Sequence, residues 1–240
     1  MGNRAVAVGI DGGSTAAKLV RYDGRKILDS KVVEARDWPS LLGMVRKGDI
    51  VCTTGYFRKK IKHDVTLTEI SAARLGVASF FPEAEVIIDL GGQDTKVIDL
   101  RDLTLQMNDK CSAGTGAFLE QAARYLGTDV EGLASMAAKA KRTVNINSTC
   151  SVFALSEMIS ALERGVTKEE VAAGLHRALS ARMAELVPEA DRIVAVGGVA
   201  MNPFLVSSLE EVLGKRILVP RRPQMVNALG AAIRAASHRP

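Results

Sequence analysis

The sequence predicts a two-lobed α/β fold on the strength of three observations. A short apolar strand that ends in an aspartate and a Gly-Gly turn occurs twice, within residues 5–22 and 86–100. Helical periodicity dominates the chain after the second copy. The chain has 240 residues, 47% of them hydrophobic, which is enough for a full core in one large domain or two small lobes.

Each copy of this pattern reads as a β-hairpin. In the first, residues 5–10 and 16–22 are the two strands, and in the second the strands lie within 86–100 on both sides of Gly91-Gly92. In each copy a lysine follows the aspartate by seven residues, which marks an internal repeat. The matching residues are Asp11 with Lys18 in the first copy and Asp89 with Lys96 in the second.

Helices are expected between and after the hairpins. Two short ones precede a crossing between lobes at Phe81-Pro82-Glu83, because proline and glycine interrupt helical patterns. A buried strand at 191–196 runs into Gly197-Gly198 and then a helix, which is typical of a nucleotide loop. The predicted helices are 39–48, 66–76, 113–126 ending at Gly127, 152–162 ending near Gly165, 167–186, 203–213 and 228–236.

Composition excludes some classes of function. Lysine and arginine exceed aspartate and glutamate by 32 − 27 = 5, but the charges are dispersed and no RNA-binding aromatic signature accompanies them, so we expect no nucleic-acid partner. The basic run 58–62 is either a solvated surface or a docking patch for an acidic partner. No apolar run reaches about 18 residues and no signal peptide is evident, so a cytoplasmic protein without a membrane segment is expected.

The three cysteines differ in setting. Cys52 lies between Val51 and Thr53 and is expected to fill the core. Cys111 and Cys150 each precede a strongly helical segment, where helix N-H groups favour a thiolate or an anionic cluster. Two cysteines make half of an iron–sulfur site, and the alternative is that both are buried small hydrophobes. The histidines His63, His176 and His238 show no metal-ligand spacing and are expected on the surface.

The repeated hairpin suits magnesium and a nucleotide triphosphate. Glycine turns can direct backbone N-H groups at phosphates while Asp11 and Asp89 hold the metal through water. A single Asp-Gly turn is as often purely structural. Two copies, together with the later segment 196–200, favour nucleotide binding.

Together these segments resemble the actin/Hsp70/sugar-kinase ATPase superfamily, in which 11–15 would be the first phosphate loop, 89–94 the second and 196–200 the adenosine loop. The resemblance implies a ribonuclease-H-like fold. Its lobe I would span 1–83, completed by the C-terminal helix 223–240, and its lobe II would span 84–222 with the second phosphate loop, the cluster cysteines and the adenosine loop.

Within that superfamily the chain is most similar to the activator ATPases of 2-hydroxyacyl-CoA dehydratases and their relatives in benzoyl-CoA reductases. The string Asn-Asp-Lys-Cys-x-Ala-Gly-Thr-Gly at 108–116 is the most specific match. The other matching segments are 10–18, 68–71, 89–96, 150–157, 196–203, Val219-Pro220 and Pro223-Gln224.

This resemblance implies a homodimer in which Cys111 and Cys150 of each subunit hold one [4Fe–4S] cluster at the twofold axis. It implies a donor such as ferredoxin or flavodoxin and, as acceptor, an iron–sulfur dehydratase or reductase that receives a low-potential electron. ATP binding and hydrolysis would change the angle between the lobes and with it the exposure and reduction potential of the cluster.

The resemblance also implies roles for individual residues. Lys18 would neutralise phosphate charge, and Gln93 or Glu69 would orient the attacking water, with the alternative that Glu69 is a helix-capping partner of Thr66. Asp94 and Lys96 are expected to be strand-surface residues. The residues expected around ATP and Mg²⁺ are Asp11, Gly12, Gly13, Ser14, Thr15, Lys18, Asp89, Gly91, Gly92 and Gln93 at the phosphates, and Gly114, Gly116, Gly197, Gly198 and Asn202 at the nucleoside.

Two positions depart from the family. Phe57 stands after Thr54-Gly55-Tyr56 where the family usually has glycine, and Ala73 stands where it has histidine. Three alternatives to a dehydratase activator remain at this stage. They are a reductase of a double-cubane cluster protein, a small-molecule kinase of the same fold, and an actin-like assembly or regulatory module.

Overall fold

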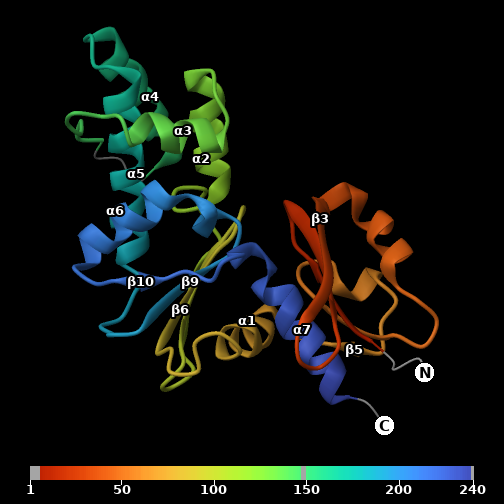
Figure 1. The fold of residues 1–240 in the computed structure, drawn as a ribbon. Coiled ribbons are helices and arrows are strands. Elements are labelled where there is room, and N and C mark those ends of the chain that lie inside the picture. The colour runs from red at the N-terminus through yellow and green to blue at the C-terminus, as the bar shows by residue number, and fades with distance from the viewer. Residues whose placement is uncertain (1–5, 147–149, 239–240) are drawn as a thin grey trace. The chain divides into compact units, whose positions relative to one another are not determined.

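The computed structural model describes residues 6–146 and 150–238 (Figure 1). The chain forms two compact α/β units. Unit 1 comprises the residues up to Ala84 and those from Pro220 onward, and unit 2 comprises Glu85–Val219. No helix in the described ranges is both long enough and apolar enough to cross a membrane.

The sheet of unit 1 has the order β3-β2-β1-β4-β5. The first hairpin forms its centre, where β1 pairs antiparallel with β2 and parallel with β4. Alternation along β1 sends Val8 and Ile10 into a cluster with Leu41, while Ala7 packs on the opposite face. The strands are β1 (Ala7–Gly12), β2 (Ala16–Tyr22), β3 (Ile27–Glu34), β4 (Ile50–Thr54) and β5 (Val65–Thr66).

Unit 1 carries two α-helices, α1 (Glu69–Ala78) and α7 (Val226–Ser237), and three 3₁₀ segments, η1 (Ala35–Met44), η2 (Arg58–Lys60) and η4 (Pro223–Met225), within the described part of the chain. Helix α7 packs against β1 and β4, where Ala231 and Ala235 enclose Cys52. The predicted short helix over 39–48 is only partly right, since the helix spans 35–44 and residues 45–48 are not helical. The segment is a 3₁₀ helix containing Pro39, because proline lacks the N-H that an α-helical ladder needs.

The sheet of unit 2 repeats that of unit 1. Its order is β10-β9-β6-β7-β8, so counted from the first strand of each unit the two sheets have the same arrangement and the same strand directions. The predicted repeat therefore extends beyond the hairpins to whole sheets. The strands are β6 (Val86–Leu90), β7 (Thr95–Asp99), β8 (Leu105–Asn108), β9 (Ile193–Val196) and β10 (Ile217–Leu218).

Helices α2 to α6 of unit 2 lie close together (Figure 1). Their buried side chains form a large hydrophobic core with strands of the sheet. The helices are α2 (Gly116–Leu126), α3 (Val130–Ala137), α4 (Ser151–Glu163), α5 (Lys168–Ala184) and α6 (Pro203–Leu213), with the 3₁₀ turn η3 (Val199–Met201). Helix α2 begins at Gly116 and not at 113 as predicted, because Gly114 has a φ of 96° and Thr115 is extended.

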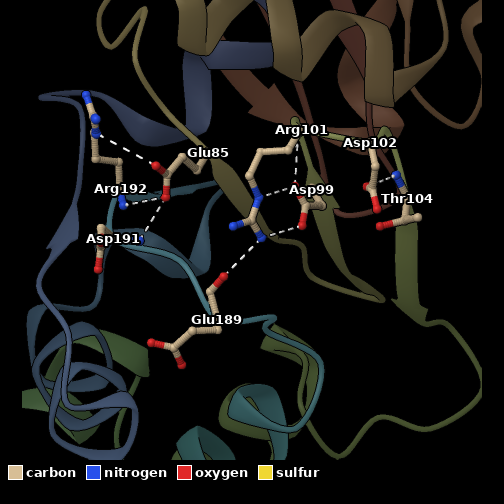
Figure 2. Close-up of polar contacts among 8 residues, drawn as sticks. All are labelled: Glu85, Asp99, Arg101, Asp102, Thr104, Glu189, Asp191 and Arg192. Atoms are coloured by element: carbon tan, nitrogen blue, oxygen red, sulfur yellow. Dashed lines mark hydrogen bonds and ion pairs between the residues drawn. The ribbon is translucent and has the colours of Figure 1, made fainter.

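A polar network braces the end of the unit 2 sheet where β6 and β9 begin (Figure 2). Glu85 accepts backbone N-H groups of Asp191 and Arg192 at 2.8 and 3.3 Å, which lowers the pKa of its carboxyl group. Arg101 donates to Asp99 at 2.7 Å and to the Glu189 carbonyl at 3.0 Å. The glycine turns lie at the opposite ends of these strands, so this network supports the sheet and is separate from the phosphate loops.

Candidate functional site

The first hairpin brings its aspartate and lysine together. Asp11 and Lys18 are partners in the β1·β2 register, and Lys18 Nζ lies 3.1 Å from Asp11 Oδ2. Both side chains are largely buried, whereas Ser14 and Thr15 in the turn are exposed. The hairpin thus combines a shielded carboxylate–ammonium pair with an accessible turn, an arrangement that can hold a phosphate and its metal ion.

The loop after β4 supports this turn. Gly55 has a φ of 93°, and a side chain on it would meet the backbone of Gly12 within 2.6 Å, so only glycine fits there. The Phe57 N-H donates to the Gly12 carbonyl at 3.1 Å, and the Phe57 ring lies against Gly12. Trp38 packs on Phe57 with ring centroids 6.0 Å apart. Phe57 therefore holds the turn of the first hairpin, the predicted first phosphate loop, in place.

A buried hydroxyl group lies beside the first carboxylate. Thr54 pairs with Asp11 in the β1·β4 register, and its Oγ1 is buried without a hydrogen-bond partner among the described residues. Buried polar groups are normally satisfied. A bound water, metal-ligating water or phosphate oxygen would satisfy this one, so the observation fits a Mg-nucleotide at this turn.

The second hairpin repeats the register but has an added acid. Asp89 and Lys96 are strand partners, as Asp11 and Lys18 are in the first. Lys96 also donates to Asp94 at 2.6 Å, and the Gly91 N-H donates to the Asp94 carbonyl at 2.9 Å. The prediction that Lys96 is a strand-surface residue is wrong. Its aliphatic stem is covered and the residue is buried, because the Asp94 carboxylate compensates its charge.

The loop after β9 closes on the second hairpin. Gly197 has a φ of 94°, and a side chain on it would lie 2.4 Å from the Leu90 carbonyl oxygen and 2.8 Å from Asp89 Oδ1. Val199 approaches Gly116 closely from the same loop. Gly198 is exposed. The predicted adenosine loop and second phosphate loop are therefore adjacent in unit 2.

A buried histidine holds this loop. The prediction that His176 lies on the surface is wrong, since it is fully buried in α5. One ring nitrogen lies 2.7 Å from the Ala172 carbonyl and the other 2.9 Å from the Asn202 side-chain nitrogen, while Asn202 Oδ1 caps α6 by accepting the Leu205 N-H. This pattern requires a neutral ring, and burial lowers the pKa of His176. Asn202 is thereby fixed at the end of the loop.

The start of α2 is hydrogen-bonded to the predicted second phosphate loop. The N-H groups of Gly116 and Ala117, which have no partner within their own helix, donate to the carbonyls of Gly91 and Gly92 at 3.0 and 2.8 Å. The buried Thr95 hydroxyl donates to the Gly114 carbonyl at 2.6 Å. The predicted Gly114 and Gly116 thus lie beside the predicted phosphate residues.

The segments of Cys111 and Cys150 meet in unit 2. The hydroxyl of Ser112 donates to the hydroxyl of Ser151 at 2.8 Å, so the residues that follow the two cysteines are in contact. Cys150 is the N-cap residue of α4, and both cysteines are partly exposed, which excludes the alternative of two fully buried hydrophobes. Residues 147–149 of the second motif lie outside the described residues.

Cys52 behaves as predicted. It is fully buried, and burial raises the pKa of its thiol to about 12. Within the described ranges, no three His, Cys, Asp or Glu side chains form a group able to hold a metal ion. One copy of the chain therefore offers two thiol groups at its cysteine site.

The predicted water-orienting residues lie in different units. Gln93 is exposed in the second phosphate loop, and Glu69 lies half-buried in the first turn of α1 in unit 1. The alternative capping role of Glu69 with Thr66 is wrong. Thr68 caps α1 by accepting the Ser71 N-H, and Thr66 lies in β5 and donates to the Thr53 carbonyl.

Comparisons with known proteins agree with this geometry. The chain is 39% identical over 249 residues to the (R)-2-hydroxyglutaryl-CoA dehydratase activating ATPase of Acidaminococcus fermentans, covering 95% of this chain and 96% of the relative. It is 38% identical to the 2-hydroxyisocaproyl-CoA dehydratase activator of Clostridioides difficile, covering 95% and 94% of the two chains.

A solved structure of that Clostridium difficile activator with bound ADPNP matches with a TM-score of 0.91 at 37% identity, covering 97% of this chain and 94% of the other. The predicted two-lobed, ribonuclease-H-like α/β fold class is confirmed. The family model described as the BadF/BadG/BcrA/BcrD ATPase family matches residues 44–235. This chain belongs to the BadF/BadG/BcrA/BcrD ATPase family.

Proposed function

We propose that the protein is an ATP-dependent activator that delivers a low-potential electron to a 2-hydroxyacyl-CoA dehydratase through a [4Fe–4S] cluster shared by two copies of the chain. The observation that carries the proposal is the hydrogen bond between Ser112 and Ser151. It holds together the segments of Cys111 and Cys150 in the unit that also contains the second phosphate loop.

The residues at the cysteines fit such a cluster. Cys150 caps the start of α4, where the helix dipole stabilises a thiolate and an anionic cluster. A cluster of this type takes four thiolates, so one chain supplies half and a twofold-related copy the rest. Val152 and Phe153, next to Cys150, are 65% and 66% exposed and provide apolar surface for that copy to cover. When bound, the cluster would supply one-electron chemistry at low potential.

The glycine turns of the two hairpins would bind the phosphates of Mg-ATP. In the first, Gly12, Gly13, Ser14 and Thr15 present backbone N-H groups, and Lys18 offsets phosphate charge. In the second, Gly92 would do so, while the Gly91 N-H donates to the Asp94 carbonyl and closes the turn. Asp89 and Asp11 would hold Mg²⁺ through water. Gln93 or Glu69 orients the attacking water.

The adenosine would lie at the loops of unit 2. Gly198 is exposed with open space beside it and would allow the nucleoside to approach the backbone. Gly114, Gly116 and Gly197 pack closely against Asn108, Val199 and Leu90 and would shape the loops around the nucleoside. Both polar atoms of the Asn202 side chain are engaged by His176 and Leu205, so we assign Asn202 to shaping the loop. Hydrolysis then depends on positioning and charge stabilisation.

The acceptor follows from the relatives. Two proteins whose names describe dehydratase activators align over 95% of this chain, which favours a dehydratase over a double-cubane reductase or a kinase substrate. The donor would be a ferredoxin or a flavodoxin. Reduced protein and ATP should activate a 2-hydroxyacyl-CoA dehydratase, whereas electron transfer only to a double-cubane protein would assign the alternative partner.

Iron and sulfide analysis of anaerobically purified protein tests the proposal. The wild type and Cys52→Ser should carry four irons per dimer and an oxygen-labile cluster spectrum, because the buried Cys52 thiol stays protonated at neutral pH. Cys111→Ser and Cys150→Ser should lose both. An iron-free wild type after anaerobic reconstitution, or full iron in Cys150→Ser, would exclude the cluster.

A further inference from the structure

We propose that residues 112–117 transmit the nucleotide state to the cysteines, and that Thr95, Ser112 and Ser151 are the positioning residues of this relay. The inference rests on the proposed function, since it assigns the coupling between ATP and the cluster to particular side chains. Every contact that carries it lies within unit 2.

The relay begins at the second phosphate loop. Gly91 and Gly92 direct their carbonyl groups at the first two N-H groups of α2, at 3.0 and 2.8 Å. Gly116 has no free space, because Val199 and Gly92 lie against it. A nucleotide phosphate that displaces the loop backbone must therefore displace the start of α2, since two hydrogen bonds and close packing join them.

The middle of the relay is the turn at residues 112–115, which is closed by hydrogen bonds between its own residues. Thr115, which is fully buried, donates from both its backbone N-H and its hydroxyl to the Ser112 carbonyl, at 3.0 and 2.8 Å. Thr95 ties the same turn to β7 through the Gly114 carbonyl at 2.6 Å. These bonds make residues 112–115 a compact block, so displacement at its α2 end reaches Ser112.

The relay ends between the cysteines. Ser112 follows Cys111, Ser151 follows Cys150, and their hydroxyl groups are 2.8 Å apart although 39 residues separate them in sequence. One hydrogen bond of this type changes an equilibrium constant about fivefold. Typical coupling factors between two sites are about 5- to 150-fold, so one such bond is strong enough to carry a coupling at the lower end of that range.

The test measures how ATP and ADP change the rate at which a chelator removes iron from the anaerobic, cluster-loaded dimer. In wild type the rate of iron removal with ATP should differ clearly from the rate with ADP, and the ratio of the two rates is the quantity compared between variants. Ser151→Ala and Ser112→Ala should each reduce that ratio about fivefold or to unity, with unchanged iron content and ATP affinity. Because both variants remove the same bond, the double variant should lose no more than either single one.

Ser135→Ala is the matched control. Its hydroxyl donates to the Glu131 carbonyl at 2.9 Å within α3, so it removes a similar bond outside the relay and should keep the wild-type ratio. Thr95→Val, which removes the central hydroxyl at nearly constant shape, should reduce the ratio as the serine variants do. It serves as the independent variant if a serine substitution impairs folding.

The outcomes separate this inference from the proposed function. A wild-type ratio retained in Ser112→Ala, Ser151→Ala and Thr95→Val would overturn the relay and leave the cluster and its response to ATP intact. A wild type with a cluster but no nucleotide effect would overturn both the relay and the ATP-coupled function. Linkage adds a reciprocal check, since cluster removal should change the affinity for ATP relative to ADP in wild type and not in Ser151→Ala.

Discussion

The two glycine hairpins share a register but differ in what supports them. In unit 1 the turn is held by the loop after β4, through the ring and N-H group of Phe57. In unit 2 the turn is held by the start of α2, whose N-H groups donate to Gly91 and Gly92. The same backbone motif is thus braced by a side chain in one unit and by a helix end in the other.

This difference shows how a duplicated motif acquires two roles. The sheets match strand for strand, and the glycines after the parallel strands, Gly55 and Gly197, have φ values of 93° and 94°. What differs is the chain that packs beside the turn. The loop that supports the first hairpin follows the buried Cys52, whereas the segment that supports the second follows the partly exposed Cys111. Both turns suit phosphate, and the second is also connected to the redox site we propose.

Replacing each of the two lysines with alanine should show the largest functional difference between the hairpins. Lys18→Ala should lower ATP turnover about 10²-fold, because it removes a cation from the phosphate site. Lys96→Ala should lower it by less than about tenfold, since Lys96 is paired with Asp94 in addition to lying opposite Asp89, and the first hairpin pairs Lys18 with Asp11 but has Ala16 at the position of Asp94. Phosphate release from purified variants measures both effects.

One further variant makes this comparison decisive. Asp94→Ala is the control for the ion pair and should reproduce the modest effect of Lys96→Ala. Equal losses of about 10²-fold in Lys18→Ala and Lys96→Ala, at equal thermal stability, would show that both lysines face the phosphates and that the hairpins are functionally alike.

The hairpins were predictable from the sequence because their signals are local. Asp11, Lys18, Asp89 and the glycine turns carry the strand and turn chemistry within a few residues. The edge strand β3 was not predicted, because most of its residues are exposed and give no alternating pattern of apolar residues. Strand β4 and helix α3 were not predicted either, because short elements take their structure from packing partners.

The contacts that connect the sites were not predictable in the same way. Ser112 and Ser151 come into contact only because α2 and α4 fold together. The two residues are 39 positions apart, and no local sequence pattern predicts such a contact. The burial of His176 could have been predicted from the sequence. It lies in line with Ala172, Leu179 and Met183 on the buried face of α5, which argues for burial. Phe57 was noticed only as a departure, and its packing on Gly12 gives that departure a role.

Removing the aromatic support should weaken unit 1 alone. Phe57→Ala should cost about 2 kcal/mol of unfolding free energy, less than for a fully buried phenylalanine because the ring is only partly covered. Trp38, the single tryptophan of the chain, packs on Phe57, so its fluorescence reports the change during urea unfolding. The KM for ATP should rise while the ATP-to-ADP ratio of chelation stays at the wild-type value. A lost ratio would show that the first hairpin also controls the cysteines.

Acid should weaken the corresponding support in unit 2. Burial holds the pKa of His176 below its ordinary value of 6.5, so the unfolded chain binds a proton more readily than the folded one. Stability from this group is therefore complete above pH 6.5 and falls as the pH drops through 6.5 toward the folded pKa, by at most about 1.4 kcal/mol per pH unit.

The stability of His176→Gln, which keeps an acceptor for Asn202 but does not titrate, should be less dependent on pH, while Phe57→Ala should keep the wild-type slope. Urea unfolding between pH 7.5 and 5.5 measures the slopes, and amide exchange at Leu205 locates the change at the cap of α6. An identical slope in His176→Gln and wild type would show that His176 is not the acid-sensitive group that supports the predicted adenosine loop. The two units would then not differ in the pH dependence of their support.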